Sequence, residues 1–80
     1  MNLYGALLEI KGNLIYYSYG TDLNDLSGIL LIDTNNKSFT NIKKPDGGVF
    51  LVHNFESFAG KILAYCLAGN IKERVSREIG

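Results

Sequence analysis

The sequence lacks the residues that commonly staple a small protein together. Among its 80 residues it has one cysteine, one histidine, one proline and no tryptophan. A single cysteine forms no internal disulfide, and zinc sites of the usual kind need several Cys or His ligands. We therefore expect no metal site, and we expect the stability of the fold to come from a packed hydrophobic core.

An excess of charge of either sign is also missing. Eight Lys and Arg side chains balance eight Asp and Glu side chains. A neutral chain exerts little long-range attraction on nucleic acid or on an anionic membrane. In the tail, Glu73 and Glu78 lie among the bases, a pattern typical of a solvated helix face. The sequence thus argues against nucleic acid as a partner.

Long hydrophobic runs are absent as well. The longest apolar run, residues 62–68, has seven residues, whereas a membrane-spanning helix needs roughly 20. No cationic stretch precedes the first apolar residues, and Glu9 interrupts them, so we expect neither a secretory leader nor a membrane segment. Cys66 lies within the apolar run and is expected to be buried as a free thiol. A free thiol favours a reducing compartment and hence the cytoplasm.

The composition that remains is that of a folding protein. Hydrophobic residues make up 46% of the chain and charged residues 20%, the opposite of the balance found in disordered chains. The length predicts a single domain over residues 1–80.

The clearest local signal is a hairpin at Gly12-Asn13. Glycine as the first central residue suits a type II′ turn, which needs a positive φ there. The resulting register pairs Ile10 with Ile15, and it extends the same face through four further residues. Ala6, Leu8, Tyr17 and Tyr19 complete this expected core face. Leu7, Leu14 and Tyr16 then lie on the second, half-apolar face.

Further strands are predicted over residues 29–32, 38–42 and 49–53. The turn residues Asn35 and Asn36 separate the first two, and residues 45–48, Pro-Asp-Gly-Gly, separate the second from the third.

The C-terminal part predicts helix. Asn54 is a candidate N-cap, and Phe55, Phe58, Ile62 and Cys66 recur three or four residues apart. Glycine at position 69 suits a left-handed helix stop.

A short tail helix is expected to follow. Asn70 and Glu73 resemble a capping box, and Ile71, Val75 and Ile79 recur every fourth residue. One helix kinked at the preceding glycine is the alternative. Together these elements predict an α+β domain, an antiparallel meander of about five short strands followed by a C-terminal helix and a short tail helix.

Catalytic and cofactor motifs are not found. Neither GxGxxG nor GxxxxGK occurs, and the acidic residues from Asp22 to Asp33 do not have the spacing of an EF-hand. His53 precedes the predicted helix, and Cys66 lies further along it by roughly 18 Å of helical rise. We therefore expect no enzyme activity and no cofactor.

The leading hypothesis is a non-enzymatic protein-binding module, either a homodimer or a small regulator or inhibitor of a larger protein. Tyrosine gives contact area with a polar tip and is enriched at interfaces. The predicted contact residues are Leu7, Leu14 and Tyr16 on the hairpin and Ile71, Val75 and Ile79 in the tail.

Two alternatives remain. The first is a small-ligand or nucleotide site near the predicted helix start. Its residues are Asp46, Gly47, Gly48, His53 and Asn54. The second, less favoured by the charge balance, is a nucleic-acid regulator that uses the tail helix.

Overall fold

The computed structural model describes residues 2–78 as one helix packed on one sheet. The elements in chain order are β1 (Asn2–Lys11), β2 (Leu14–Gly20), β3 (Gly28–Asp33), β4 (Ser38–Lys43), α1 (Val52–Leu67) and β5 (Arg74–Glu78). This confirms the predicted α+β class with five antiparallel strands. None of the described residues forms a helix long and apolar enough to cross a lipid bilayer.

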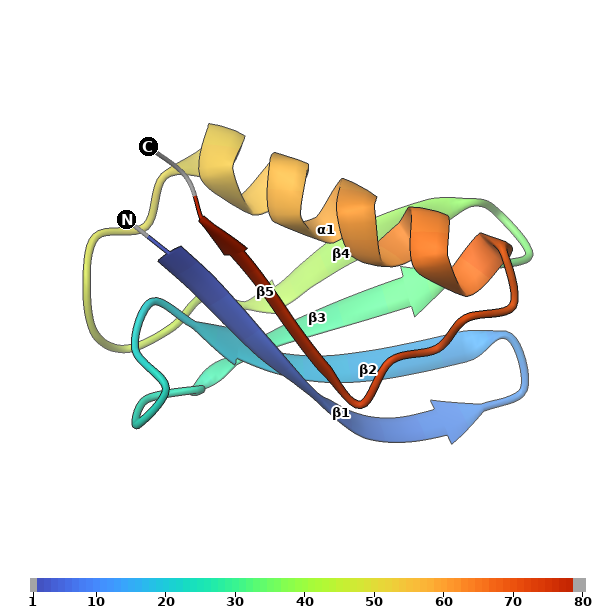
Figure 1. Ribbon diagram of the computed structural model, residues 1–80, viewed down its shortest axis with the longest axis horizontal. Helices are drawn as coiled ribbons and strands as arrows, with labels where there is room; N and C mark the ends of the chain where they lie inside the picture. Colours follow the sequence, from blue (N-terminus) through green and yellow to red (C-terminus); the bar gives the residue numbers. More distant parts are fainter. Residues whose placement is uncertain (1, 79–80) are drawn as a thin grey trace.

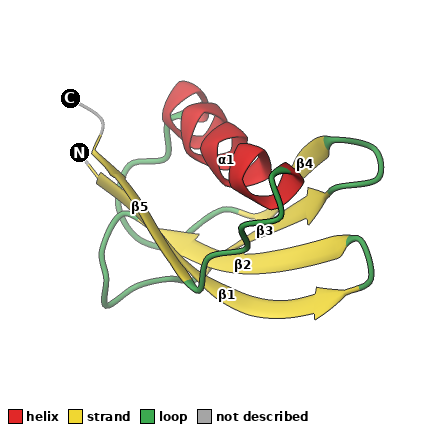
Figure 2. Ribbon diagram, turned by 45° about the vertical axis from the view of Figure 1, so that its right-hand side comes forward, coloured by secondary structure: helices red, strands yellow, loops and turns green. Residues whose placement is uncertain are grey.

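The sheet has the strand order β4-β3-β2-β1-β5. The first four strands form the expected meander, because each pairs with its neighbour along the chain. The chain then crosses one face of the sheet as α1 and returns as β5 beside β1 (Figure 1). As Figure 2 shows, the helix covers one face of the sheet, and no second helix among residues 2–78 covers the other.

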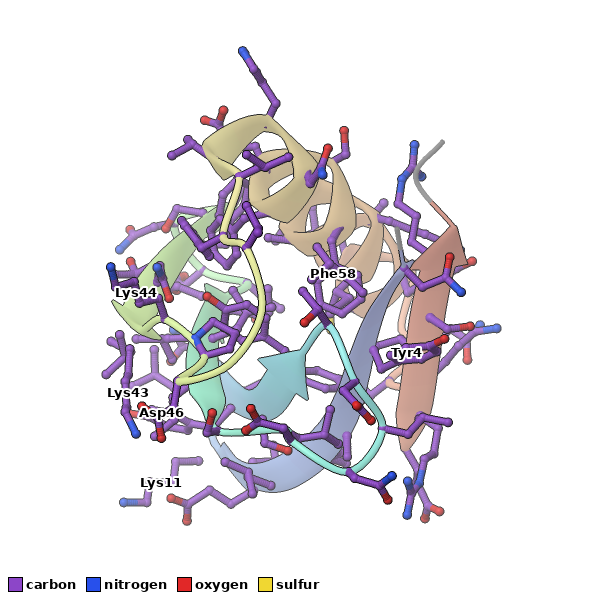
Figure 3. The ribbon with its side chains drawn as sticks, turned by 90° about the vertical axis from the view of Figure 1, so that its left-hand side faces the viewer. Tyr4, Lys11, Lys43, Lys44, Asp46 and Phe58 are labelled. Atoms are coloured by element: carbon purple, nitrogen blue, oxygen red, sulfur yellow. The ribbon has the colours of Figure 1, made fainter. Side chains whose placement is uncertain are left out.

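The core lies between α1 and the covered face. The fully buried phenol rings of Tyr17 and Tyr19 lie at its centre, and Phe58 points into it from the helix (Figure 3). Sheet and helix side chains complete the cluster: Leu3, Ile15, Leu30, Ile32 and Val75 from the strands, and Phe55, Ala59, Ile62 and Cys66 from α1. The predicted apolar stripe of the helix and the buried free cysteine are thereby confirmed.

The hairpin turn at Gly12-Asn13 is confirmed. Gly12 has φ +60°, and Asn13 is not among the residues with positive φ. That combination is the type II′ turn, since type I′ would need positive φ at both positions. Ile10 pairs with Ile15 as expected.

Further along β1 the predicted core face is wrong. A β-bulge between Leu7 and Glu9 shifts the register, so that Leu7 pairs with Tyr17 and Gly5 with Tyr19. Ala6 therefore turns away from the core, and Leu8, at the bulge, is 55% exposed. A side chain slips to the other face whenever one strand gains a residue, because side chains alternate with period two.

Close packing explains why glycine occupies the core face of β1. A Cβ on Gly5 would lie 2.9 Å from Cγ2 of Val75 and 3.0 Å from Cζ of Phe58. Helix and last strand thus approach β1 at a point where only a hydrogen atom fits.

The start of α1 differs from the prediction. The helix begins at Val52, its N-cap residue is Leu51, and no side chain caps it. Asn54 is therefore inside the first turn and is not the N-cap. Residues 49–51 form a loop in place of the predicted strand over 49–53. The aromatic packing of Phe50 and Phe55, whose ring centroids are 5.8 Å apart, holds this loop against the core.

The tail is a strand, and the prediction of a second helix is wrong. β5 runs antiparallel to β1, with Tyr4 opposite Ser76 and Gly5 opposite Val75. An isolated helix of about ten residues is marginal in water. Pairing with the free edge of β1 instead satisfies the backbone and buries Val75, which is 8% exposed.

Candidate functional site

The main candidate site is the face of the sheet opposite α1, here called the open face. Tyr17 and Leu30 point into the core, so their neighbours Tyr16 and Leu31 point the other way. Tyr16 and Leu31 are directly paired across β2 and β3. Cross-strand partners share a face, so the pairing of all five strands defines the whole surface.

The open face has an apolar centre and a polar rim. Its centre consists of partly exposed side chains from the three middle strands: Tyr4, Ala6, Leu14, Tyr16, Ile29 and Leu31, with the polar Ser18 between Ala6 and Ile29. Its rim consists of polar side chains: Glu9, Lys11, Asp33, Ser38, Thr40, Lys43, Arg74 and Ser76. An apolar centre within a polar rim is the anatomy of protein–protein interfaces.

The predicted contact residues are only partly brought together. Leu14 and Tyr16 lie on the open face, as expected. Leu7 does not, because the β1 bulge turns it toward Tyr17 and it packs against the core. Val75 is also a core residue, so its assignment as a contact residue is wrong.

The other two tail residues do not join the surface. Ile71 is exposed and lies in the segment between α1 and β5, away from the strand pairings that define the open face. Ile79 lies outside the residues that the structure describes.

Ile29 and Leu31 belong to the open face but were missed from the sequence. The run of four apolar residues in β3 is typical of a buried strand and does not indicate which of its faces is exposed. In the structure the burial of β3 alternates. The signal that would have found them is the shortage of helix elsewhere in the chain, since one helix covers only one face of a sheet.

The two turns beside Leu14 stiffen one end of the open face. The Asp33 carboxylate accepts hydrogen bonds from the backbone N–H groups of Asn35 and Asn36, each at 3.0 Å, and from Nδ2 of Asn13 at 2.8 Å. The bonds from Asn36 first, and then from Asn13 and Asn35, lower the pKa of Asp33. A fixed negative charge therefore borders the apolar centre here.

The opposite end of the open face is bordered by the loop between β2 and β3. Leu23 in this loop is 61% exposed and shares a shallow hollow with Tyr4 and Ser76. Tyr4 is a residue of β1, and its side chain lies next to β5 (Figure 3). Leu23 therefore extends the apolar surface beyond the ends of β1 and β5.

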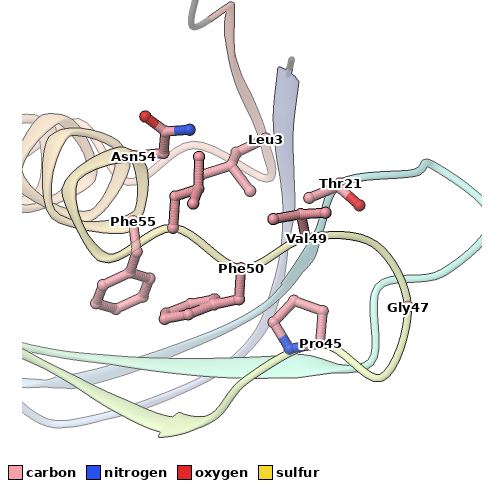
Figure 4. Close-up of a pocket in the computed structure, with 9 residues that line it drawn as sticks. Leu3, Thr21, Pro45, Gly47, Val49, Phe50, Asn54 and Phe55 are labelled. Atoms are coloured by element: carbon pink, nitrogen blue, oxygen red, sulfur yellow. The ribbon is translucent and has the colours of Figure 1, made fainter.

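The structure does not bring the five residues of the alternative small-ligand site together in one hollow. Gly47 and Asn54 line a hollow between the start of α1 and the loop before it (Figure 4). Asp46 is instead turned toward Lys43, with 3.4 Å between its Oδ1 and Nζ. Gly48 is exposed with φ +79°, and a Cβ at this position would collide with Oγ1 of Thr21. His53 is fully exposed beside Glu56.

The size of this hollow limits what it could hold. Its volume is about 10 Å³, which is room for about one water molecule. Pockets for small ligands typically measure about 300 Å³ or more. A small-ligand function at residues 46–54 stays a prediction, and a ligand would have to open the packing between Phe50 and Phe55.

Cys66 and His53 lie at opposite ends of α1 and do not form a pair. Cys66 is buried near the end of α1, and burial raises the pKa of its thiol, while His53 lies in the first turn of the same helix. Within residues 2–78, no three His, Cys, Asp or Glu side chains are placed to hold a metal ion.

Comparison of the chain with protein-family models, with curated proteins and with solved structures found no match. The geometry of the described residues is therefore the basis for assigning a function.

Proposed function

We propose that this protein is a non-enzymatic protein-binding module that pairs with a second copy of itself through the open face. The observation that carries the proposal is the apolar centre of that face, where Tyr16, Leu31 and Leu14 meet on neighbouring strands with no helix over them among residues 2–78. A sheet normally buries such a face against another layer. A second copy of the sheet supplies that layer.

The charges favour a second copy as the occupant. The chain carries equal numbers of acidic and basic side chains, so two copies have no net repulsion. The rim holds both signs: Glu9 and Asp33 are its anions, and Lys11, Lys43 and Arg74 are its cations. Two copies related by a twofold axis can therefore place the cations of one beside the anions of the other.

Chain length supports the same conclusion. A domain of about 80 residues buries only about 60% of the surface that its unfolded chain exposes. Small domains often gain the missing burial by association. Face-to-face packing of two sheets at a spacing of about 10 Å is a standard way to achieve it.

The proposal gives no residue a catalytic role. The only histidine is fully exposed, with Glu56 as its neighbour at 4.0 Å. Cysteine reacts as the thiolate, and burial disfavours that form at Cys66. A free thiol suits a reducing compartment, and we place the protein in the cytoplasm.

Sedimentation velocity over a range of protein concentrations tests the dimer. We expect the unmodified protein to sediment as a dimer and the double variant Leu14→Asp with Tyr16→Ser to sediment as a monomer. Loss of two central contacts should weaken association roughly 100-fold, the scale of losing an interface hot spot. A double variant that dimerises as strongly as the unmodified protein would show that the open face is not the contact.

The matched control changes two exposed apolar residues on the other layer. Val52 and Leu67 are 60% and 45% exposed on α1, so Val52→Asp with Leu67→Ser makes the surface polar without touching the open face. This control should still dimerise. Circular dichroism checks that each variant is folded, and an unmodified protein that stays monomeric at every concentration contradicts the proposal.

A further inference from the structure

The outer edge of β5 is a second surface with its own chemistry. β5 is an end strand of the sheet. The N–H of Leu7 donates to the carbonyl of Glu73 at 2.8 Å, and in an antiparallel pair the residues alternate between facing the partner strand and facing away. Arg74 and Ser76 therefore direct their backbone N–H and C=O groups outward, where residues 2–78 provide no further strand.

One of these outward-facing backbone groups accepts a hydrogen bond from a side chain of the protein itself. Nζ of Lys61, from α1, donates a hydrogen bond to the carbonyl oxygen of Ser76 at 3.1 Å. This contact agrees with the direction deduced from the strand pairing. It also covers the edge with a single flexible group, which an incoming strand could displace.

Cations surround this edge. A groove of about 230 Å³ runs between α1 and β5, and its lining consists of Lys61, Tyr65, Lys72, Arg74, Val75 and Ser76. Nζ of Lys72 is 4.5 Å and Nζ of Lys61 is 5.8 Å from the centre of the Tyr65 ring. The ring thus has two cations close to it, and Arg74, a rim residue of the open face, also lines the groove.

The acidic residue closest along the chain, Glu73, is not among the residues that line the groove. It lines a neighbouring hollow with Leu8 and Glu9, and Arg74 borders both hollows. The cations also argue against pairing between two copies of this edge, since their like charges would face one another.

The other sheet edge lacks these features. β4 carries a bulge between the residues that pair with Ile29 and Leu30, which interrupts its outer hydrogen-bonding row. Its cation Lys43 is already paired with Asp46 at 3.4 Å.

We propose that the groove beside β5 captures an extended, acidic segment of another protein, which adds to the sheet as a sixth strand. Its backbone bonds the outward groups of Arg74 and Ser76, and its carboxylates lie among the cations from Lys61, Lys72 and Arg74. Strand addition of this kind draws affinity from main-chain bonds and specificity from side chains. Arg74 and Ser76 are shared with the rim of the open face, but the groove lies on the α1 side of β5, beside Lys61 and Tyr65. Contacts through the centre of the open face therefore leave it accessible to a partner.

Fluorescence anisotropy with a labelled peptide of alternating Glu and Val residues tests the proposal. We expect this peptide to bind. An alternating Lys-Val peptide should bind at least roughly tenfold more weakly because of its charge. The Glu-Val peptide methylated at alternate backbone nitrogens should also bind weakly, since it lacks strand hydrogen bonds. Absence of Glu-Val binding, or equal binding of the Lys-Val or the methylated peptide, overturns the proposal.

Protein variants locate the site. Lys61→Gln with Lys72→Gln should weaken Glu-Val binding roughly three- to tenfold, the range for two surface charge pairs. The matched control, Lys37→Gln with Lys44→Gln, removes two exposed lysines far from the groove and should bind as the unmodified protein does. Equal losses in both variants would mean a general charge effect and would overturn the assignment.

Two further readouts distinguish the groove beside β5 from the rest of the protein surface. Amide NMR shifts on peptide addition should be largest at Arg74 and Ser76, and shifts confined to β4 or to the centre of the open face on β2 and β3 contradict the proposal. The Leu14→Asp with Tyr16→Ser variant should keep its peptide affinity, so failure of the dimer leaves this test intact. A single-stranded oligonucleotide that binds the groove as tightly as the peptide would reassign it to nucleic acid and overturn the proposal.

Discussion

Two buried tyrosines contribute hydrogen bonds to the core as well as apolar contacts. The hydroxyl of Tyr17 donates to the backbone carbonyl of Lys72 at 2.5 Å, a contact that spans 55 positions of the chain. The hydroxyl of Tyr19 donates to Oδ1 of Asn41 at 2.7 Å. Tyr17 therefore anchors the segment that leads into β5, and Tyr19 links β2 to β4. Their polar tips satisfy hydrogen bonds that Phe or Leu could not make.

The same tyrosines predict a stability loss at high pH. Burial raises the pKa of both Tyr17 and Tyr19 to about 12. The neutral phenol is therefore favoured in the folded state, and its contribution is complete below the unfolded pKa of about 10. It is lost as the pH rises toward 12. We expect the urea midpoint to fall steeply across that interval.

Tyrosinate absorbance measured against pH checks this expectation. Tyr17→Phe and Tyr19→Phe should each remove one late-ionising group and flatten the alkaline fall of the urea midpoint. A titration without a late step, recorded while circular dichroism still shows folded protein, contradicts it.

At the scale of elements, α1 has capping hydrogen bonds at its C-terminal end but no side-chain cap at its N-terminal end. Its first turn has no side-chain cap. Its last turn closes with the N–H of Gly69 on the carbonyl of Cys66 at 3.0 Å and the N–H of Asn70 on the carbonyl of Tyr65 at 2.9 Å. This pair of bonds is a Schellman motif, and the φ of +78° at Gly69 makes it possible.

Two glycines in and beside α1 predict opposite effects of the same substitution. Gly69→Ala should lower the free energy of unfolding by about 1 kcal/mol, because alanine resists the left-handed conformation. Gly60→Ala should raise it by about 0.5–1 kcal/mol through helix propensity, since a Cβ at Gly60 meets nothing within 4 Å. Urea unfolding of the two variants measures both values. Changes of the same sign would mean that the two backbone environments were wrongly assigned.

At the scale of the whole molecule, the two ends of the chain complete one sheet. β5 reaches β1 only after the chain has crossed the covered face as α1. Leu3 and Val75 then enter the same buried cluster. The stability of the domain therefore depends on its last strand as well as on the meander that precedes it.

Neighbouring tail residues test this dependence. Val75→Asp should lower the free energy of unfolding by about 3 kcal/mol or more, because it buries a charge without a partner. Ser76→Asp, one position along and exposed, should change it by less than about 0.5 kcal/mol. Urea unfolding compares the two variants. Similar small effects would show that the tail is not paired in the sheet and would restore the helical interpretation.

The sequence predicted two of the six apolar residues at the centre of the open face. Leu14 and Tyr16 were placed there because the type II′ turn sets the register of β2, and that turn depends on two adjacent residues. Leu7 was misplaced because the bulge between Leu7 and Glu9 shifts the register of β1, and the alternation of side chains along one strand does not reveal a bulge. Ile29 and Leu31 were missed because an apolar strand does not reveal how many of its faces are covered.

The features that the sequence alone determined depend on residues a few positions apart in the chain. The α+β class, the hairpin at Gly12-Asn13, the buried stripe of α1 and the helix stop at Gly69 all follow from such short-range rules. Only the tertiary structure decided which side of β1 faces the core, that the tail pairs as β5, and that one sheet face lies open. Strand pairing joins residues far apart in the chain, and the preference of a segment for strand depends on the edge it meets, which no local pattern encodes.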